Sequence, residues 1–120
     1  MVLADTSVWI QHFRQGEPAL AELLSQGWIL MHPCVAGELA CGNLKKRAAV
    51  LSDLRALPGA TTVSDEEVMQ FIEDRRLWGR GLGWIDFHLL ASAMLSECGL
   101  WTLDRRLSRT ARELGLRGAG

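Results

Sequence analysis

The sequence predicts an α/β fold in which helices cover both faces of a mostly parallel sheet. Short apolar runs alternate with longer segments of helical periodicity along the whole chain. Such runs are typical of parallel strands, which are buried on both faces. The chain has 120 residues, of which 48 % are hydrophobic and 22 % charged. This size and composition predict a single globular domain over residues 1–120.

Four short segments, bounded mostly by Gly, Pro, Asp or Ser residues, are the predicted strands. They are residues 2–4, 28–31, 60–63 and 100–103. Three of these segments are apolar, and the third in order is rich in threonine. Asp5 directly follows the first strand and Asp104 directly follows the last, so each carboxylate can cap the helix that comes next.

Helices are predicted between and after these strands from their caps, breakers and apolar faces. Pro18 and Pro33 stand at first turns, where the missing N–H costs no hydrogen bond. Ser64 and Glu67 form a capping box at the start of another helix. The predicted helices are residues 8–14, 18–26, 33–41, 44–57, 65–78, 86–98 and one that begins after Asp104. The helix over 86–98 is nearly all apolar, which predicts a central position in the fold.

The charge and the cysteines exclude several classes of protein. Lys and Arg total 13 against 14 Asp and Glu, a net charge of -1. This balance excludes a polybasic binder and an acidic disordered chain, but it is compatible with a local basic patch for nucleic acid. Three cysteines without a C-x-x-C pair argue against a disulfide framework. No signal peptide or membrane-spanning run is visible, so we expect a cytoplasmic protein without membrane contact.

Four acidic residues form the candidate site. Asp5 and Asp104 follow strands, and parallel strands place both carboxylates at the same edge of the sheet, where ligands bind in such folds. Glu38 and Asp86 lie inside apolar stretches, where an unpaired carboxylate is costly to bury. Taken singly, the three aspartates are also explained as ordinary helix caps or first-turn residues.

If the four carboxylates converge, they need a cation. Two carboxylates about 4 Å apart repel each other by roughly 4 kcal/mol at an effective dielectric constant near 20. No Cys and His set at ligand spacing accompanies them, and sites made of oxygen ligands favour Mg²⁺ or Mn²⁺. The chemistry that follows is hydrolysis of a phosphodiester by a metal-activated water.

Four segments of the sequence together resemble the PIN-domain family. They are Asp5-Thr6-Ser7-Val8-Trp9-Ile10, the lone Glu38, Gly83-Trp84-Ile85-Asp86-Phe87-His88-Leu89-Leu90-Ala91-Ser92 and Leu100-Trp101-Thr102-Leu103-Asp104-Arg105-Arg106-Leu107. The chain is most similar to the VapC-type toxins of toxin–antitoxin pairs. The likeness covers nearly the whole chain, with the segments in matching order.

The resemblance implies a Mg²⁺- or Mn²⁺-dependent endoribonuclease with a three-layer α/β/α sandwich, which commonly forms a homodimer and is inhibited by a cognate antitoxin. It makes Asp5, Glu38, Asp86 and Asp104 the catalytic and metal-binding quartet. Some PIN proteins carry another acid two residues after the last of these, where this chain has Arg106. Because arginine cannot act as a carboxylate ligand, a second metal would be held less firmly here than in those proteins.

The predicted substrate-binding residues are Thr6, Ser7, Arg80 and Trp84. Ser7 takes the small polar position two residues after Asp5, where the resemblance suggests that it orients a metal-bound water. Arg80 lies in the glycine-rich segment 79–83, where its guanidinium can bind phosphate oxygens. Trp84 can stack on an unpaired RNA base. Without a function, Arg80 is explained as part of a solvated helix end, and Trp84 is explained by core packing.

Two other functions compete with a toxin ribonuclease. One is a PIN-like RNA-processing nuclease outside a toxin–antitoxin pair, and the other is a non-catalytic α/β binding module whose acids are only helix caps. A phosphoryl-transfer domain with an aspartyl nucleophile fits less well, because Asp5-Thr6-Ser7 lacks the second Asp of haloacid-dehalogenase-like motifs.

Overall fold

The sheet at the centre of the molecule has three short parallel strands. In the computed structural model, which describes residues 1–118, they lie in the order β2-β1-β3. Leu3 of the central strand pairs with Leu30 on one side and Leu100 on the other. The strands are β1 (Val2–Ala4), β2 (Ile29–Leu30) and β3 (Gly99–Trp101). All three carboxyl ends therefore lie at one edge of the sheet.

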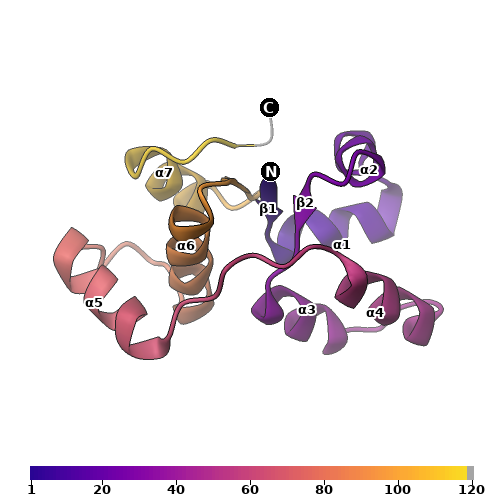
Figure 1. Cartoon of the computed structure of the whole chain (residues 1–120), viewed down its shortest axis with the longest axis horizontal. Helices are drawn as coiled ribbons and strands as arrows, with labels where there is room; N and C mark the ends of the chain where they lie inside the picture. Colours follow the sequence, from indigo (N-terminus) through magenta and orange to yellow (C-terminus); the bar gives the residue numbers. More distant parts are fainter. Residues whose placement is uncertain (119–120) are drawn as a thin grey trace.

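Seven helices surround the strands in residues 1–118. They are α1 (Thr6–Gln15), α2 (Pro18–Ser25), α3 (Pro33–Ala40), α4 (Arg47–Ala56), α5 (Asp65–Arg75), α6 (Trp84–Ser96) and α7 (Arg105–Glu113). In Figure 1, α1, α2 and α4 lie to the right of the strands, α3 lies below them, and α5, α6 and α7 lie to the left. The predicted α/β fold with a parallel sheet and helices on both sides is confirmed. Residues 119 and 120, which the predicted domain includes, lie outside the described part of the chain.

Several predicted element ends are shifted by a few residues. The helix predicted over 44–57 begins only at Arg47, because Lys46 has a left-handed φ of 51°. The helix predicted over 65–78 ends at Arg75, because Arg76 has a φ of 54°. The last strand is residues 99–101 rather than 100–103, and α6 begins at Trp84 rather than at residue 86. Neither left-handed residue is a glycine, so no breaker in the sequence marks these ends.

The strand predicted over 60–63 is wrong. The segment makes one isolated bridge, between Gly59 and Met31, in which the N–H of Ala60 donates to the carbonyl of Met31 at 2.9 Å. The N–H of Thr61 donates to Ser96 Oγ at 2.8 Å, and Ser92 Oγ donates to the carbonyl of Thr61. Side chains of α6 therefore satisfy the backbone groups that a neighbouring strand would have paired, and the segment runs past the sheet as a loop.

Helix α6 is the central helix, as its apolar sequence predicts. Seven consecutive residues from Phe87 to Ala93 are buried, which requires neighbours on every side of the helix. Figure 1 shows α6 between the strands and α5. Burying side chains such as Leu89 and Leu90 stabilises the fold by about 1.5–3 kcal/mol each. The first turn of this well-packed helix carries Asp86. In residues 1–118 no helix has the length and apolar character needed to cross a membrane.

Candidate active site

Asp5 lies at the carboxyl end of β1, where its side chain is only 7 % exposed and accepts four hydrogen bonds. Oδ1 accepts from the N–H groups of Ser7 at 3.0 Å and Val8 at 3.4 Å, and also from Ser7 Oγ. Oδ2 accepts from Thr102 Oγ1. These donors offset the cost of burying the carboxylate. They also fix the direction in which it points.

Two hydroxyl groups join the loop after β1 to the loop after β3. Ser7 Oγ accepts from the N–H of Leu103 at 3.1 Å, and Thr102 Oγ1 accepts from the N–H of Asp104 at 3.0 Å. Because both hydroxyls also donate to Asp5, the first and last acids are linked through shared neighbours. Sequence reasoning missed Thr102. Its signal is a hydroxyl residue at the end of a strand, two positions before an acidic cap.

Asp104 caps α7, as predicted. Its Oδ1 accepts from the N–H groups of Arg106 at 2.8 Å and Leu107 at 3.1 Å. The Asp5 side chain caps α1 in the same manner, through Ser7 and Val8. The capping role that explains these acids without function is therefore real. In the described residues the Oδ2 atom of Asp104 has no donor and Asp5 Oδ2 has one, so these two oxygens are the ones left to bind a cation.

Glu38 belongs to α3 and reaches α1. Its Oε1 accepts a hydrogen bond of 2.7 Å from Thr6 Oγ1. Thr6 is the residue after Asp5, so this contact brings Glu38, the second acid in chain order, to the segment that carries Asp5. The predicted substrate residue Thr6 is thus occupied with holding Glu38.

Asp86 and Glu38 each accept one hydrogen bond in the described residues, but Glu38 is exposed to water whereas Asp86 is half-buried. Asp86 Oδ2 accepts its hydrogen bond from the N–H of Gly83 at 2.9 Å, and so caps the start of α6. Burial raises the pKa of Asp86 above its usual range, and the negative charges of Asp104 and Asp5 raise it further. The three aspartates are therefore close enough to repel one another, although they lie on three separate segments of the chain.

The four acids are brought to one region, but their carboxylates do not already form a closed metal cage. In the part of the chain that the structure describes, no three Asp, Glu, His or Cys side chains are grouped tightly enough to hold an ion. Each of the four is turned toward a local hydrogen-bond donor. The donor set, oxygen only and mutually repulsive, nevertheless fits a hard divalent cation such as Mg²⁺ or Mn²⁺.

The other two predicted substrate residues lie at the glycine loop, residues 79–83. Trp84 is 42 % exposed, and its ring meets the ring of His88 edge to face, with the centroids 4.8 Å apart. Arg80 forms an ion pair with Glu113 of α7, a partner that the sequence did not suggest. A partly exposed tryptophan thus stands beside Asp86, and Arg80 has a protein partner for part of its guanidinium.

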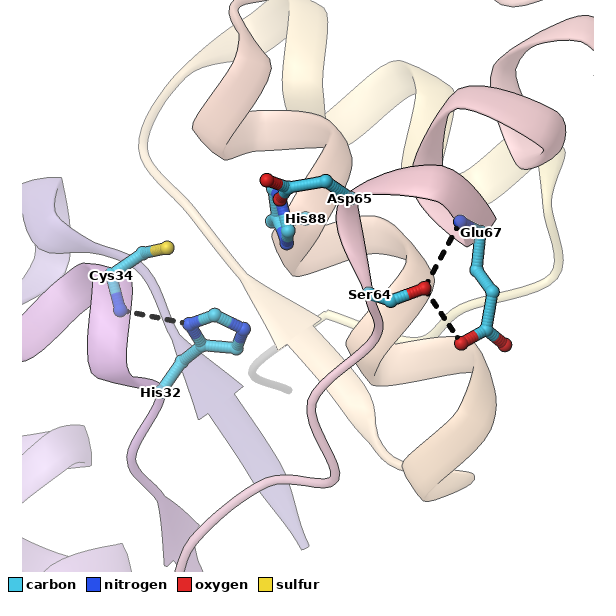
Figure 2. A network of polar contacts seen from close by, with 6 residues as sticks. All are labelled: His32, Cys34, Ser64, Asp65, Glu67 and His88. Carbon is cyan, nitrogen blue, oxygen red and sulfur yellow. Dashed lines mark hydrogen bonds and ion pairs between the residues drawn. The ribbon is translucent and has the colours of Figure 1, made fainter.

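A second polar cluster involves residues at the starts of α3 and α5 and on α6 (Figure 2). His88 Nε2 lies 2.9 Å from Asp65 Oδ1, and His32 Nδ1 accepts from the N–H of Cys34 at 2.9 Å. Burial lowers the pKa of His32, and His88 lowers it further. Because Nδ1 accepts from Cys34, the proton of the neutral ring is on Nε2, a buried atom without a hydrogen-bond partner among the described residues. The contact between His88 and Asp65 joins α6 to α5, and His32 caps the start of α3. The three cysteines are free, in agreement with the absence of a disulfide framework.

A groove of about 560 Å³ borders the acidic region. Glu38 forms part of its wall, together with residues of α1, α3 and the segment that leads into α4. The other lining residues are Ile10, Phe13, Arg14, Leu39, Gly42, Asn43, Leu44, Lys45 and Val50. The groove is therefore mostly apolar, with two basic side chains and one acid.

A family model and two curated relatives show the family of the chain, and a solved structure shows the same fold. The PIN domain model matches residues 2–113. The chain is 44 % identical over 117 residues to Ribonuclease VapC32 from two strains of Mycobacterium tuberculosis, CDC 1551 / Oshkosh and ATCC 25618 / H37Rv; the match covers 97 % of this chain and 94 % of those proteins. The crystal structure of PAE2754 from Pyrobaculum aerophilum has the same fold, with a TM-score of 0.64 and 18 % identity over 98 % of this chain and 83 % of that one. The chain therefore belongs to the PIN-domain family and, within it, to the VapC-type ribonucleases.

Proposed function

We propose that residues 1–120 form a single nuclease domain that hydrolyses RNA phosphodiester bonds with the help of Mg²⁺ or Mn²⁺. The observation that carries the proposal is the carboxylate of Asp86, which burial and the nearby charges of Asp104 and Asp5 disfavour in its ionised form. A divalent cation would relieve this repulsion. The 44 % identity to Ribonuclease VapC32 supports RNA as the substrate.

Asp5, Glu38, Asp86 and Asp104 are the residues that would hold the ion and act in catalysis. When bound, such an ion supplies an activated water and neutralises charge on the phosphate. The hydroxyl groups of Thr102 and Ser7 would hold the Asp5 carboxylate in its present orientation. The Asp86 carboxylate would have to break one hydrogen bond, from the Gly83 N–H, to rotate toward the ion. Their hydrogen-bond partners would thus keep Asp5 fixed and leave Asp86 able to adjust.

The remaining predicted residues would bind and orient the RNA. Ser7 Oγ already lies on Asp5 and can orient a water there. Thr6 would act through Glu38, which it holds. Trp84 offers an exposed ring for stacking on an unpaired base, an interaction worth about 1–3 kcal/mol per base. Arg80 would meet a phosphate with the edge of its guanidinium that Glu113 does not occupy.

The proposed biological role is that of the toxin of a toxin–antitoxin pair, acting in the cytoplasm as a homodimer. The groove beside Glu38 supports an antitoxin partner, because an apolar segment bound there would lie against a proposed catalytic acid. If a small protein is encoded beside this chain, co-expression of the two should give a complex that no longer cleaves RNA. A free, active nuclease under those conditions would favour an RNA-processing role.

The nuclease is tested by incubating the purified protein with single-stranded and structured RNA, with Mn²⁺, with Mg²⁺ or with a chelator. Cleavage should require the metal and should be lost in Asp5→Asn and Asp86→Asn. Asp53→Asn is the matched control, because Asp53 is exposed on α4. Variants at Asp5 and Asp86 that cleave as fast as Asp53→Asn would refute the assignment of the site.

A further inference from the structure

The glycine loop leads directly into the proposed active site. Gly79 and Gly81 have left-handed φ values of 74° and 76°, and the N–H of Gly83 is the hydrogen-bond donor to Asp86. The position of the loop therefore affects where the Asp86 carboxylate lies. A loop with three glycines in five residues has little stiffness of its own.

Two arginines connect this loop to α7. Arg80 forms an ion pair with Glu113 in the last turn of the helix. In its first turn, the side chain of Arg106 lies against Gly81: a Cβ on Gly81 would be 2.5 Å from Arg106 Nη1 and 3.2 Å from its Cδ. Only a glycine allows this approach without a shift of the arginine. The two contacts start from neighbouring residues of the loop and reach opposite ends of the helix.

The same helix carries Asp104. Its Oδ1 accepts from the backbone N–H of Arg106, so the arginine that touches Gly81 belongs to the turn that Asp104 caps. Arg106 and Glu113 are seven residues apart, or about 10 Å along the helix axis. The loop is thus held at two separate points along α7, which limits rotation as well as translation of the loop relative to Asp104.

We propose that Arg80, Glu113 and Arg106 are positioning residues that hold the glycine loop on α7 and so set the place of Asp86 relative to Asp104. The inference rests on the proposed function, because its consequence is the affinity of these acids for a divalent cation. The side chains of Arg80 and Glu113 are 33 % and 50 % exposed, so their ion pair contributes little to global stability. Its loss should change the loop and leave the fold intact.

The test compares Arg80→Gln, Glu113→Gln and the exchanged pair Arg80→Glu with Glu113→Arg. Thermal melting is followed against Mn²⁺ concentration, and RNA cleavage is measured as kcat and KM. Each single variant should raise the Mn²⁺ concentration for the half-maximal melting shift by about three- to tenfold and lower kcat, while metal-free melting stays as in the parent. The exchanged pair should recover most of both losses. Arg112→Gln, an exposed change on the same helix, should leave the Mn²⁺ response unchanged.

Arg106→Ala tests the second contact of the loop, the one between Arg106 and Gly81. Arg106→Lys should keep part of this contact. Amide hydrogen exchange of residues 79–86 without metal measures the loop directly, and it should be faster in Arg80→Gln, Glu113→Gln and Arg106→Ala than in the parent. Unchanged exchange in these variants would overturn the inference. So would a rise in KM for Arg80→Gln alone, with Glu113→Gln unaffected, because that result assigns Arg80 to RNA phosphate only. A parent protein that neither responds to Mn²⁺ nor cleaves RNA would instead refute the proposed function, and the exchange rates would still decide the role of the loop contacts.

Discussion

Asp5 and Asp86 lie in the same acidic region, but Asp5 is buried and Asp86 is half-buried, and their surroundings differ. Asp5 accepts four hydrogen bonds, two from hydroxyl groups and two from backbone N–H groups. Asp86 accepts one, from Gly83. The segment around Asp5 follows a central strand, whereas the segment before Asp86 is the glycine loop. One carboxylate is therefore held ready by the fold, and the other pays a desolvation cost that only a proton or a cation can relieve.

The two aspartates therefore have opposite effects on the stability of the metal-free protein. Asp5 contributes to stability through its partners, so its loss should harm the fold and the chemistry together. Asp86 has a raised pKa because its ionised form is poorly compensated, so the metal-free protein is less stable for carrying it at neutral pH. A cation-binding site commonly contains such a carboxylate, because the bound ion stabilises its charge and so restores the stability that the ionised group removes.

The largest effect is expected for Asp5→Asn. The amide nitrogen cannot accept the hydrogen bonds that the carboxylate oxygen accepts, so buried donors from Ser7 or Thr102 lose their partner. RNA cleavage should fall by at least about 100-fold. Melting without metal should fall by about 5 °C or more, since an unsatisfied buried group costs about 1–3 kcal/mol. If the Asp5→Asn protein melted at the parent temperature, Asp5 would not stabilise the fold through its hydrogen bonds, and the proposed difference from Asp86 would be wrong.

Thr102→Val should lower cleavage by about tenfold with a smaller loss of stability. The change keeps the shape of the side chain but removes the donor to Asp5 Oδ2 and the acceptor for the N–H of Asp104. Thr102→Ser should restore most of the rate, because it returns the hydroxyl. Single-turnover cleavage at saturating Mn²⁺ makes the comparison, and equal rates for the valine and serine variants would show that the hydroxyl does not orient Asp5.

The smallest effect is expected for the stability of Asp86→Asn, and its sign is the opposite of that for Asp5→Asn. Because the folded-state pKa of Asp86 is raised, ionisation of this group destabilises the fold as pH rises through that pKa. Asparagine removes the ionisation and still accepts from the Gly83 N–H. Melting in chelator should rise by about 1–3 °C at neutral pH.

This gain has a pH dependence that checks its cause. It should shrink on acidification through the raised pKa of Asp86 and vanish below the ordinary value of 3.8, where both the folded and the unfolded parent are protonated. A gain of equal size at all pH values would assign it to packing. A loss of stability at neutral pH would show that Asp86 is as well compensated as Asp5.

Much of the fold and of the site could be predicted because the signals are local. Asp5 and Asp104 are caps directly after strands, and the apolar sequence of α6 predicted its burial. The ends at Lys46 and Arg76 could not be predicted, since a left-handed residue other than glycine leaves no mark in the sequence. The threonine-rich segment at 60–63 has strand propensity, but Ser92 and Ser96 of α6 satisfy part of its backbone.

The parts of the site that were missed depend on long-range contacts. Thr102 reaches Asp5 across 97 positions of sequence, and Arg80 reaches Glu113 across 33. Periodicity and capping rules describe neighbours within a few residues, so they placed Asp5 and Asp104 at helix starts but did not indicate the contacts that Thr102 and Arg80 make. The hydrogen bond from Thr6 to Glu38 is of the same kind, with its partner 32 positions away.

The position of Glu38 has one more consequence. Its side chain is both a wall of the apolar groove and a proposed ligand of the cation, so occupancy of the groove and occupancy of the metal site are thermodynamically linked. A groove ligand that draws Glu38 away from Asp5 must weaken the binding of Mn²⁺ by some factor. Linkage requires that Mn²⁺ weaken the groove ligand by the same factor, so the concentration of free divalent cation would set how firmly an inhibitor is held.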